Sequence, residues 1–293
     1  MSNPLGQPSE SHSFNLAEVN TAVAGTEFHG WLMNFPTVPS TNDLATEAAR
    51  AGARHGVWIA DEQTAGRGRG AHTWHSAPGP KDAPAGLYMT ALTSPAVPLE
   101  STLRLSFRTA IAVQSAIAST FGFQVRDQID IRWPNDLLLN GRKCGGILID
   151  TASEPVRPPQ PPMLRYAIIG IGINLNHTDF PPDLDPIATS IRRELSPATA
   201  PLPREPLTAA ILNCLDEEIR WMIRGWRGTD NRRSVDLNLY SSWLTGKRVS
   251  VEARDGVPSY TGTTAVLTPQ GFLLVAGDDG QVHTVLSGGL REP

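Results

Sequence analysis

Residues 61–70, DEQTAGRGRG, place two arginines among three glycines. Glycine lets the backbone approach a ligand closely and adopt positive φ angles. The arginine guanidinium offers a planar fork of hydrogen-bond donors that matches carboxylate or phosphate oxygens. The segment lacks the G-x-G-x-x-G spacing of a dinucleotide fold, and no GK[ST] triplet follows it. The pattern therefore predicts an anion-binding loop of another kind, with a solvated basic turn as the alternative.

A second candidate is the run RWPNDLLLNGRKCGGIL over residues 132–148. Asn-Gly at 140–141 between apolar flanks predicts a β-hairpin with a two-residue turn. In the simplest register Leu138 faces Lys143 and Asp136 faces Gly145. Cys144 then points to the opposite face of the hairpin, where it is expected to pack rather than react.

Asp136 and Lys143 fall on one face of this hairpin as diagonal neighbours. They could form an ordinary cross-strand ion pair. Gly145 and Gly146 follow the lysine directly, and glycines within a strand often mark a site where a ligand approaches closely. The alternative is therefore a lysine held over a ligand and steered by a carboxylate.

Alternating helix and strand signals surround these two segments. Ser40 followed by Asp43 has the form of a capping box and predicts the start of a helix. Strands are expected at 56–64, 86–94 and 164–176, and long helices at 103–122 and 207–226. After residue 244 short strands with Gly and Asp turns predict a small separate β-barrel. Residues 1–34 show no sustained periodicity, which indicates a flexible or loosely docked extension.

Composition narrows the class of protein. The 293 residues carry a formal net charge of -4, which argues against nucleic acid as the main partner. The sequence has no apolar run near the length of a membrane span. Cys144 and Cys214 are far apart, without a CxxC pair, so neither a disulfide framework nor a zinc site is indicated. Arg50 is the first basic residue, so the amino terminus lacks the positive region of a secretory signal and a cytoplasmic setting is expected.

Four segments in one order resemble the catalytic core of biotin protein ligases. They are STN at 40–42, DEQTAGRGRG with a following Trp, RWPNDLLLNGRKCGGIL, and GIGINLN at 170–176. The resemblance implies an α+β fold: a class II synthetase-like catalytic domain over 35–240, with a mixed β-sheet and flanking helices. It also implies a small SH3-like β-barrel over 241–293, after the flexible extension of 1–34.

The resemblance implies a ligase that uses ATP with Mg²⁺. Biotin would react with ATP to give biotinyl-5′-AMP, and a lysine of a biotin carboxyl carrier domain, as in acetyl-CoA carboxylase, would then take the biotin. Both first-step reactants are anions, so cations must hold them together. Two alternatives are a lipoate or octanoate ligase of the same fold and a non-catalytic biotin or adenylate sensor. Some biotin ligases also repress transcription, but residues 1–34 hold no Lys or Arg to neutralise DNA phosphates.

The resemblance also assigns residues. Biotin contacts fall on Ser40, Thr41, Asn42, Gln63, Gly66, Arg67, Gly68, Arg69, Lys143 and Gly146. Catalytic roles fall on Lys143, Arg67, Arg69 and Asp136, nucleotide contacts on Trp74, Asn135 and Asn174, and no protein metal ligands are assigned. The arginine loop of the family orders over its ligand.

Purely structural roles are alternatives to several of these assignments. Ser40 could be a plain helix cap, Trp74 a core residue, and Asn135, Asp136 and Asn174 strand-end hydrogen-bonding groups. The chain also departs from the family pattern at 70–72, where Gly, Ala and His stand in place of further basic or glycine-paired positions.

Overall fold

The computed structural model describes residues 14–70, 72–76, 83–155, 159, 161–195, 200–228, 240–253, 258–268, 270–286 and 289–293. Its strands form two sheets, one of seven strands and one of five. The seven-stranded sheet has the order β1-β2-β3-β7-β6-β5-β4. Its strands are β1 (Leu32–Val38), β2 (Gly56–Gln63), β3 (Gly86–Thr93), β4 (Ile129–Arg132), β5 (Asp136–Leu139), β6 (Arg142–Ser153) and β7 (Leu164–Asn174).

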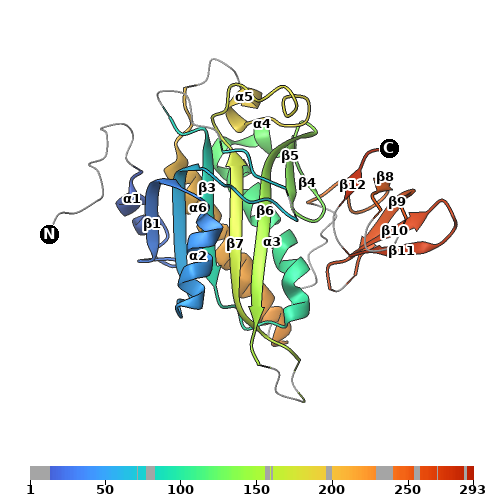
Figure 1. The fold of residues 1–293 in the computed structure, drawn as a ribbon, viewed down its shortest axis with the longest axis horizontal. Coiled ribbons are helices and arrows are strands. Elements are labelled where there is room, and N and C mark those ends of the chain that lie inside the picture. The colour runs from blue at the N-terminus through green and yellow to red at the C-terminus, as the bar shows by residue number, and fades with distance from the viewer. Residues whose placement is uncertain are drawn as a thin grey trace.

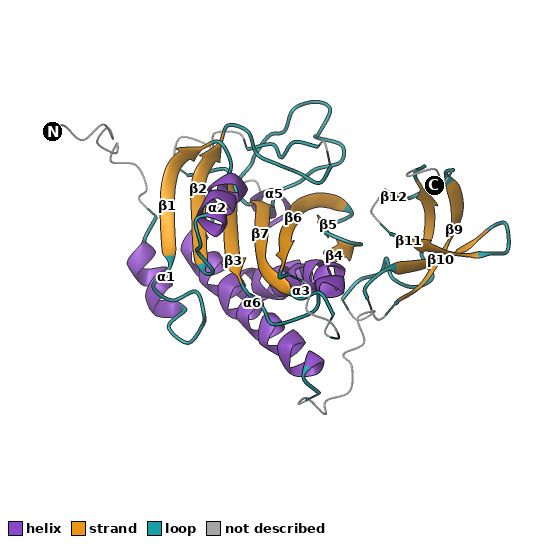
Figure 2. Cartoon of the chain, turned by 60° about the horizontal axis from the view of Figure 1, so that its bottom comes forward, coloured by secondary structure: helices purple, strands orange, loops and turns teal. Residues whose placement is uncertain are grey.

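The large sheet is mixed, because β1 pairs with β2 in parallel and the remaining neighbours pair antiparallel. The long helices α3 (Thr102–Phe121) and α6 (Arg204–Trp226) cover one face, and α2 (Thr41–Arg50) lies on the other (Figures 1 and 2). Three shorter helices and a 3-10 turn complete the layers: α1 (Leu16–Ala22), η1 (Leu99–Ser101), α4 (Phe123–Arg126) and α5 (Ile191–Leu195).

Burial follows the apolar pattern of the sequence. Every residue of β3 is buried, as expected for a central strand covered on both faces. The main core joins the α3 and α6 side of the sheet through residues such as Phe107, Ile111, Ile211 and Leu215. A smaller cluster under α2 contains Ala45, Trp58, Leu92 and Ile168. The sheet is thereby packed against apolar side chains on both faces.

The segment before residue 35 is more ordered than its sequence indicated. Val19, Val23 and Phe28 are fully buried and belong to the main core. Asn15 caps α1 by accepting a hydrogen bond from the Glu18 backbone N–H at 3.1 Å. The expected flexible extension is therefore wrong for residues 14–34, which supply a packed helix and the first residues of the edge strand β1. Residues 1–13 lie outside the described residues.

The carboxyl-terminal sheet is antiparallel, with the order β11-β10-β9-β8-β12. Its strands are β8 (Arg248–Val251), β9 (Tyr260–Leu267), β10 (Leu273–Gly277), β11 (Val282–Val285) and β12 (Leu290–Arg291). It lies beside β4 in Figure 1, where Trp133 Nε1 donates to the Gly271 carbonyl at 3.0 Å. The α+β class with a mixed sheet is confirmed, and the second sheet is consistent with the small SH3-like domain.

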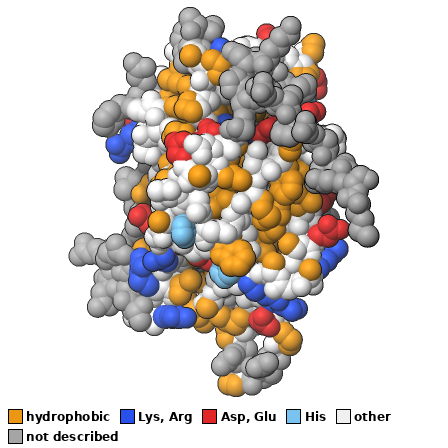
Figure 3. Space-filling model, turned by 90° about the vertical axis from the view of Figure 1, so that its left-hand side faces the viewer, with side chains coloured by type: hydrophobic (Ala, Val, Ile, Leu, Met, Phe, Trp, Pro, Cys, Tyr) orange, Lys and Arg blue, Asp and Glu red, His pale blue; other side chains and the backbone are white. Residues whose placement is uncertain are grey.

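The molecular surface is mixed in character. Figure 3 shows the side of the molecule on which β1 lies, with hydrophobic patches between separate basic and acidic side chains. Within the described ranges no helix is both long enough and apolar enough to cross a bilayer.

Candidate active site

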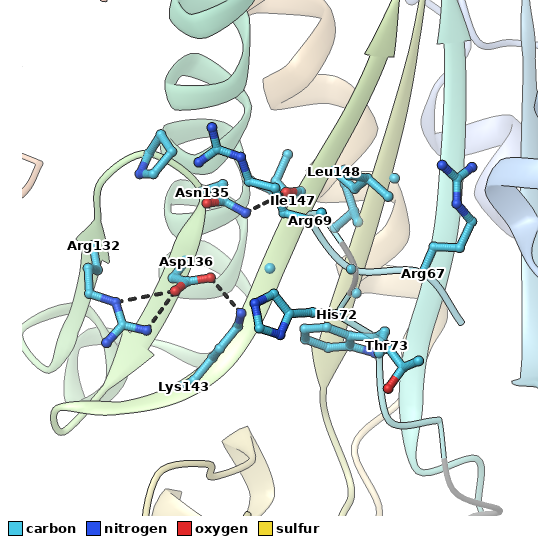
Figure 4. Close-up of a pocket in the computed structure, with 18 of the residues that line it drawn as sticks. Arg67, Arg69, His72, Thr73, Arg132, Asn135, Asp136, Lys143, Ile147 and Leu148 are labelled. Carbon is cyan, nitrogen blue, oxygen red and sulfur yellow. Dashed lines mark hydrogen bonds and ion pairs between the residues drawn. The ribbon is translucent and has the colours of Figure 1, made fainter. Parts of the chain in front are cut away.

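A cavity of about 480 Å³ opens between the arginine loop, the β5–β6 hairpin, the start of α2 and the carboxyl-terminal sheet. Figure 4 shows lining side chains from the loop and the hairpin. Twelve of the site residues predicted from the sequence line it: Ser40, Thr41, Asn42, Gln63, Arg67, Gly68, Arg69, Trp74, Asn135, Asp136, Lys143 and Gly146. Gly66 and Asn174 are not among its lining residues. The fold therefore brings segments far apart in the sequence to one site.

Lys143 and Asp136 form the ion pair expected of the hairpin. Lys143 Nζ lies 2.5 Å from Asp136 Oδ1, and Arg132 Nη2 lies 2.6 Å from Asp136 Oδ2. Burial alone would raise the pKa of Asp136. The charges of Lys143 and Arg132 and their hydrogen bonds outweigh burial, so this pKa lies below its usual value. The carboxylate therefore stays ionised and holds the ammonium at the cavity wall (Figure 4).

The register of this hairpin differs from the simplest one. Asn140 and Gly141 have φ angles of 51° and 77°, which confirms the expected turn, and Leu138 faces Lys143. Asp136 pairs with Gly146, however, so its predicted pairing with Gly145 is wrong. The ladder shifts by one residue around Cys144, which forms a β-bulge.

The Cys144 thiol packs in the core and is not a reactive group. Cys144 is fully buried, and burial raises its pKa to about 12. Since the thiolate is the nucleophilic form, this thiol is inert at neutral pH.

Glycines of β6 and β7 make room for Trp74. A Cβ atom on Gly172 would lie 2.6 Å from the indole, and one on Gly146 would lie 3.0 Å from it. Lys143 Nζ lies 5.6 Å from the centre of the same ring. Trp74 Nε1 is buried without a hydrogen-bond partner. The tryptophan is thus part of the cavity wall rather than of either apolar core cluster.

The STN segment forms a polar corner of the cavity. Ser40 precedes α2 as expected, but its side chain makes no capping hydrogen bond. Gln63 Oε1 takes that role, since it accepts hydrogen bonds from the Thr41 backbone N–H at 2.9 Å and from Thr41 Oγ1 at 3.2 Å. The buried Ser40 hydroxyl is therefore left at the cavity wall.

Asn42 is the second group fixed in this corner. Its Oδ1 accepts a hydrogen bond from Thr90 Oγ1 at 2.6 Å, while its Nδ2 is buried without a partner. A Cβ atom on Gly170 would lie 2.2 Å from Asn42 Oδ1, so only glycine permits this placement. An unpaired buried donor costs free energy until a ligand acceptor reaches it.

The arginine loop folds back on itself over the cavity. Gly68 N donates to the His72 carbonyl at 2.8 Å, and Trp74 N donates to the Gly66 carbonyl at 2.8 Å. Gly66 permits this close approach of the two ends of the loop, because a Cβ atom there would lie 2.7 Å from the Trp74 carbonyl oxygen.

The two loop arginines point in different directions. Arg69 extends toward Asn135, whereas Arg67 points away from Lys143 (Figure 4). Arg67 Nη1 lies 3.2 Å from Asp43 Oδ1 and 3.3 Å from Asp150 Oδ2.

The asparagines of the site take partly structural roles. Asn135 lines the cavity, and its Nδ2 donates to the Ile147 carbonyl at 2.9 Å. Asn174 lies outside the cavity lining, and its Nδ2 donates to the Thr189 carbonyl at 3.1 Å. This hydrogen bond is of the strand-end kind left open for Asn174, and its contact with a nucleotide stays a prediction.

Sequence reasoning missed several residues of the site. Arg132 stands directly opposite Asp136 across the β4–β5 turn, so counting across that turn would have found it. Glu252 and Arg291 line the cavity from the carboxyl-terminal sheet, and no local signal relates them to Lys143. Among the described residues, no three His, Cys, Asp or Glu side chains cluster to hold a metal ion.

Fold and site together identify the class of protein to which the chain belongs. The model of the Biotin/lipoate A/B protein ligase family matches residues 35–174, the span that carries the lysine hairpin, the arginine loop and the STN corner. The solved structure of the biotin protein ligase from Aquifex aeolicus in complex with biotin and ATP has the same fold. Its TM-score is 0.65 at 22% identity, and the match covers 89% of this chain and 98% of that one.

Curated relatives narrow the class. The bifunctional ligase/repressor BirA of Bacillus subtilis (strain 168) is 34% identical over 253 residues, which cover 85% of this chain and 70% of the relative. The biotin--[acetyl-CoA-carboxylase] ligase of Mycobacterium tuberculosis is 30% identical over 220 residues, covering 74% of this chain and 73% of the relative. The chain belongs to the biotin protein ligase family, and it is a ligase.

Proposed function

We propose that this enzyme attaches biotin to one lysine of a biotin carboxyl carrier domain, using ATP and passing through biotinyl-5′-AMP. The observation that carries the proposal is that one cavity holds the Lys143 ammonium, the arginine loop and the polar STN corner. The complexes of relatives with biotin and ATP support the same two ligands here. A cytoplasmic location and the absence of DNA binding stay predictions.

The STN corner suits the ureido ring of biotin. A ureido group offers one carbonyl acceptor and two N–H donors, so its site needs matched polar groups in a mostly apolar pocket. Asn42 Nδ2 is an unpaired donor and the Ser40 hydroxyl can donate and accept, whereas Thr41 Oγ1 donates to Gln63 Oε1 and can only accept from a ligand. The valeryl chain of biotin would then extend toward Lys143, past Trp74 and the glycines of β6 and β7.

In the first step a carboxylate oxygen of biotin would attack the α-phosphorus of ATP, and the bond to the β-phosphate oxygen would break with release of pyrophosphate. Two anions must approach, so positive charge fixed before the reaction lowers the barrier. Lys143 lies at the cavity wall and Arg69 extends into the same region. Because Asp136 already orients the ammonium, little reorganisation is needed when charge develops.

In the second step the neutral amine of the carrier lysine would attack the acyl carbon. The new C–N bond replaces the bond to the phosphate oxygen, AMP leaves, and the amine loses a proton. The same cations would stabilise the oxygen that accumulates charge and the departing AMP.

Mg²⁺ is expected to bind together with ATP, coordinated by its phosphates. It is commonly held by one or two carboxylates together with substrate phosphates. Glu252 at the cavity wall is one such carboxylate, although it already pairs with Arg291 Nε at 2.5 Å, and Asp136 is bonded to two cations. Bound Mg²⁺ would neutralise phosphate charge, and the residues above would bind and orient the reactants.

Lys143→Ala tests the proposal. The enzyme is incubated with labelled biotin, ATP, Mg²⁺ and a carrier domain, and both biotinyl-AMP and labelled carrier are measured. Loss of one preorganised charged donor should lower the rate of adenylate formation about 10²- to 10³-fold. Lys247→Ala is the matched control, because Lys247 lies outside the cavity lining.

Two outcomes would overturn the assignment. Transfer of lipoate or octanoate in preference to biotin would identify the alternative ligase of the same fold. Tight binding of biotin and ATP by the wild-type enzyme without turnover would identify a sensor.

A further inference from the structure

Lys143 lies where β6 changes its neighbour. The last pair between β6 and β7 is Gly145 with Ile173, so Lys143 extends beyond the end of β7. Its backbone N–H donates to the Ile187 carbonyl at 2.8 Å, and its carbonyl accepts from Thr189 N at 2.9 Å. Residues 187–189 thus replace β7 beside the lysine as a short parallel bridge.

The Glu194 carboxylate ties this bridge to the hairpin turn. It accepts hydrogen bonds from Thr189 Oγ1 at 2.5 Å, from Arg142 Nη2 at 2.5 Å and from Asn140 Nδ2 at 2.6 Å. One acidic side chain of α5 therefore joins the segment that pairs with Lys143 to residues of the turn and strand just before it.

The environment of Glu194 is built for a carboxylate. Its side chain is 10% exposed, and all three partners are donors. Burial alone would raise its pKa, but the hydrogen bonds from Thr189 and Asn140 and the charge of Arg142 outweigh burial and lower it. Glu194 is absent from the cavity lining, so any influence on the reaction must pass through the residues that it holds.

We propose that Glu194 is a positioning residue for Lys143: it locks the hairpin turn onto residues 187–189 and so sets where the ammonium stands in the cavity. The inference rests on the proposed function. It adds to the site a residue that lies about 50 positions from the hairpin in the sequence and fixes the place of Lys143. Asn174 supports the same bridge, because its side chain donates to the Thr189 carbonyl at 3.1 Å.

A double-mutant cycle tests this role. Single-turnover formation of biotinyl-AMP at saturating biotin and ATP is measured for wild type, Glu194→Ala, Lys143→Ala and the double variant. Misplacing a reacting group by about 1 Å costs on the order of 10²-fold in rate, so Glu194→Ala should lose about 10- to 100-fold. In the Lys143→Ala background the same substitution should lose less than about twofold, since residues that act as a unit are non-additive.

Glu218→Ala controls for loss of stability alone. Glu218 of α6 accepts a part-buried hydrogen bond from Arg108 Nη1 at 3.0 Å, away from the cavity. It should lower Tm without changing the single-turnover rate well below Tm. If Glu194→Ala does not fold, Thr189→Val removes one donor at nearly constant volume and should show a smaller, equally non-additive loss.

The outcomes separate the two proposals. A wild-type enzyme that makes no biotinyl-AMP would refute the proposed function. An active wild type in which the losses from Glu194→Ala, or from Thr189→Val, and Lys143→Ala multiply would refute only the positioning role of Glu194.

Discussion

The lysine hairpin and the arginine loop deliver cations to the same cavity by different means. Lys143 is held by both of its backbone groups and by Asp136, whose side chain is 17% exposed. Arg67 is 43% exposed, and its partners Asp43 and Asp150 are 54% and 38% exposed. Exposed pairs of this kind contribute about 0–1 kcal/mol. The hairpin is therefore a preorganised part of the site, whereas the Arg67 side chain is held weakly; opening of the loop for ligand exchange stays a prediction.

Asp136→Asn tests the preorganised hairpin, because it removes the carboxylate charge that pairs with Lys143 and Arg132. Removing one partner of a fully buried pair costs about 3–5 kcal/mol, and this part-buried pair should lose less, because solvent partly screens the charges left behind. The folded-state pKa of Asp136 is depressed, so its stabilisation is present above the unfolded-state pKa of about 4 and is lost as pH falls through the folded value. Urea unfolding at pH 7 to 3 should show a large deficit of the variant near pH 7 that shrinks below about pH 4.

Asp43→Asn is the matched control on the loop side. Its free energy of unfolding should follow that of wild type within about 1 kcal/mol across the same pH range. If the free energy of unfolding of Asp136→Asn equalled that of wild type at every pH, the hairpin pair would be no stronger than the loop pair.

Gly172→Ala probes the contact between the loop and the sheet. The new Cβ atom would lie 2.6 Å from the Trp74 indole, so the ring and the loop that carries it must move. Overpacking of this kind costs about 1–3 kcal/mol. Trypsin should therefore cleave faster after Arg67 and Arg69. Gly225→Ala in α6 meets nothing within 4 Å and should be neutral or stabilising.

The smallest effect is expected from the double variant Asp43→Ala, Asp150→Ala. Its Tm should stay close to that of wild type, but tryptic cleavage after Arg67 should rise severalfold because the exposed partners are gone. Addition of biotin and ATP should slow cleavage in both proteins. A cleavage rate that ligands leave unchanged would contradict a loop that orders over its substrates.

The sequence predicted local features well where one segment contains its own signal. The turn at Asn140 and Gly141 and the facing of Leu138 and Lys143 follow from the Asn-Gly pair and alternation alone. The bulge at Cys144 did not follow, because nothing in that short run distinguishes a regular ladder from one shifted by a residue.

Features that depend on distant segments were missed for a different reason. Glu194 bonds to the hairpin from about 50 residues away, and no periodicity relates the two. Val19 lies in a helix of only seven residues and Val23 is the residue that caps its end, so the segment is too short for a helical period to stand out. Tertiary packing, rather than local propensity, orders that helix.

The cavity wall runs from Ser40 to Arg291, so its residues come from nearly both ends of the described chain. β12 is the last strand in sequence and closes one side of the wall. During synthesis the ribosome releases this strand after every other described element. The cavity wall is therefore complete only when β12 has emerged and paired with β8 in the carboxyl-terminal sheet.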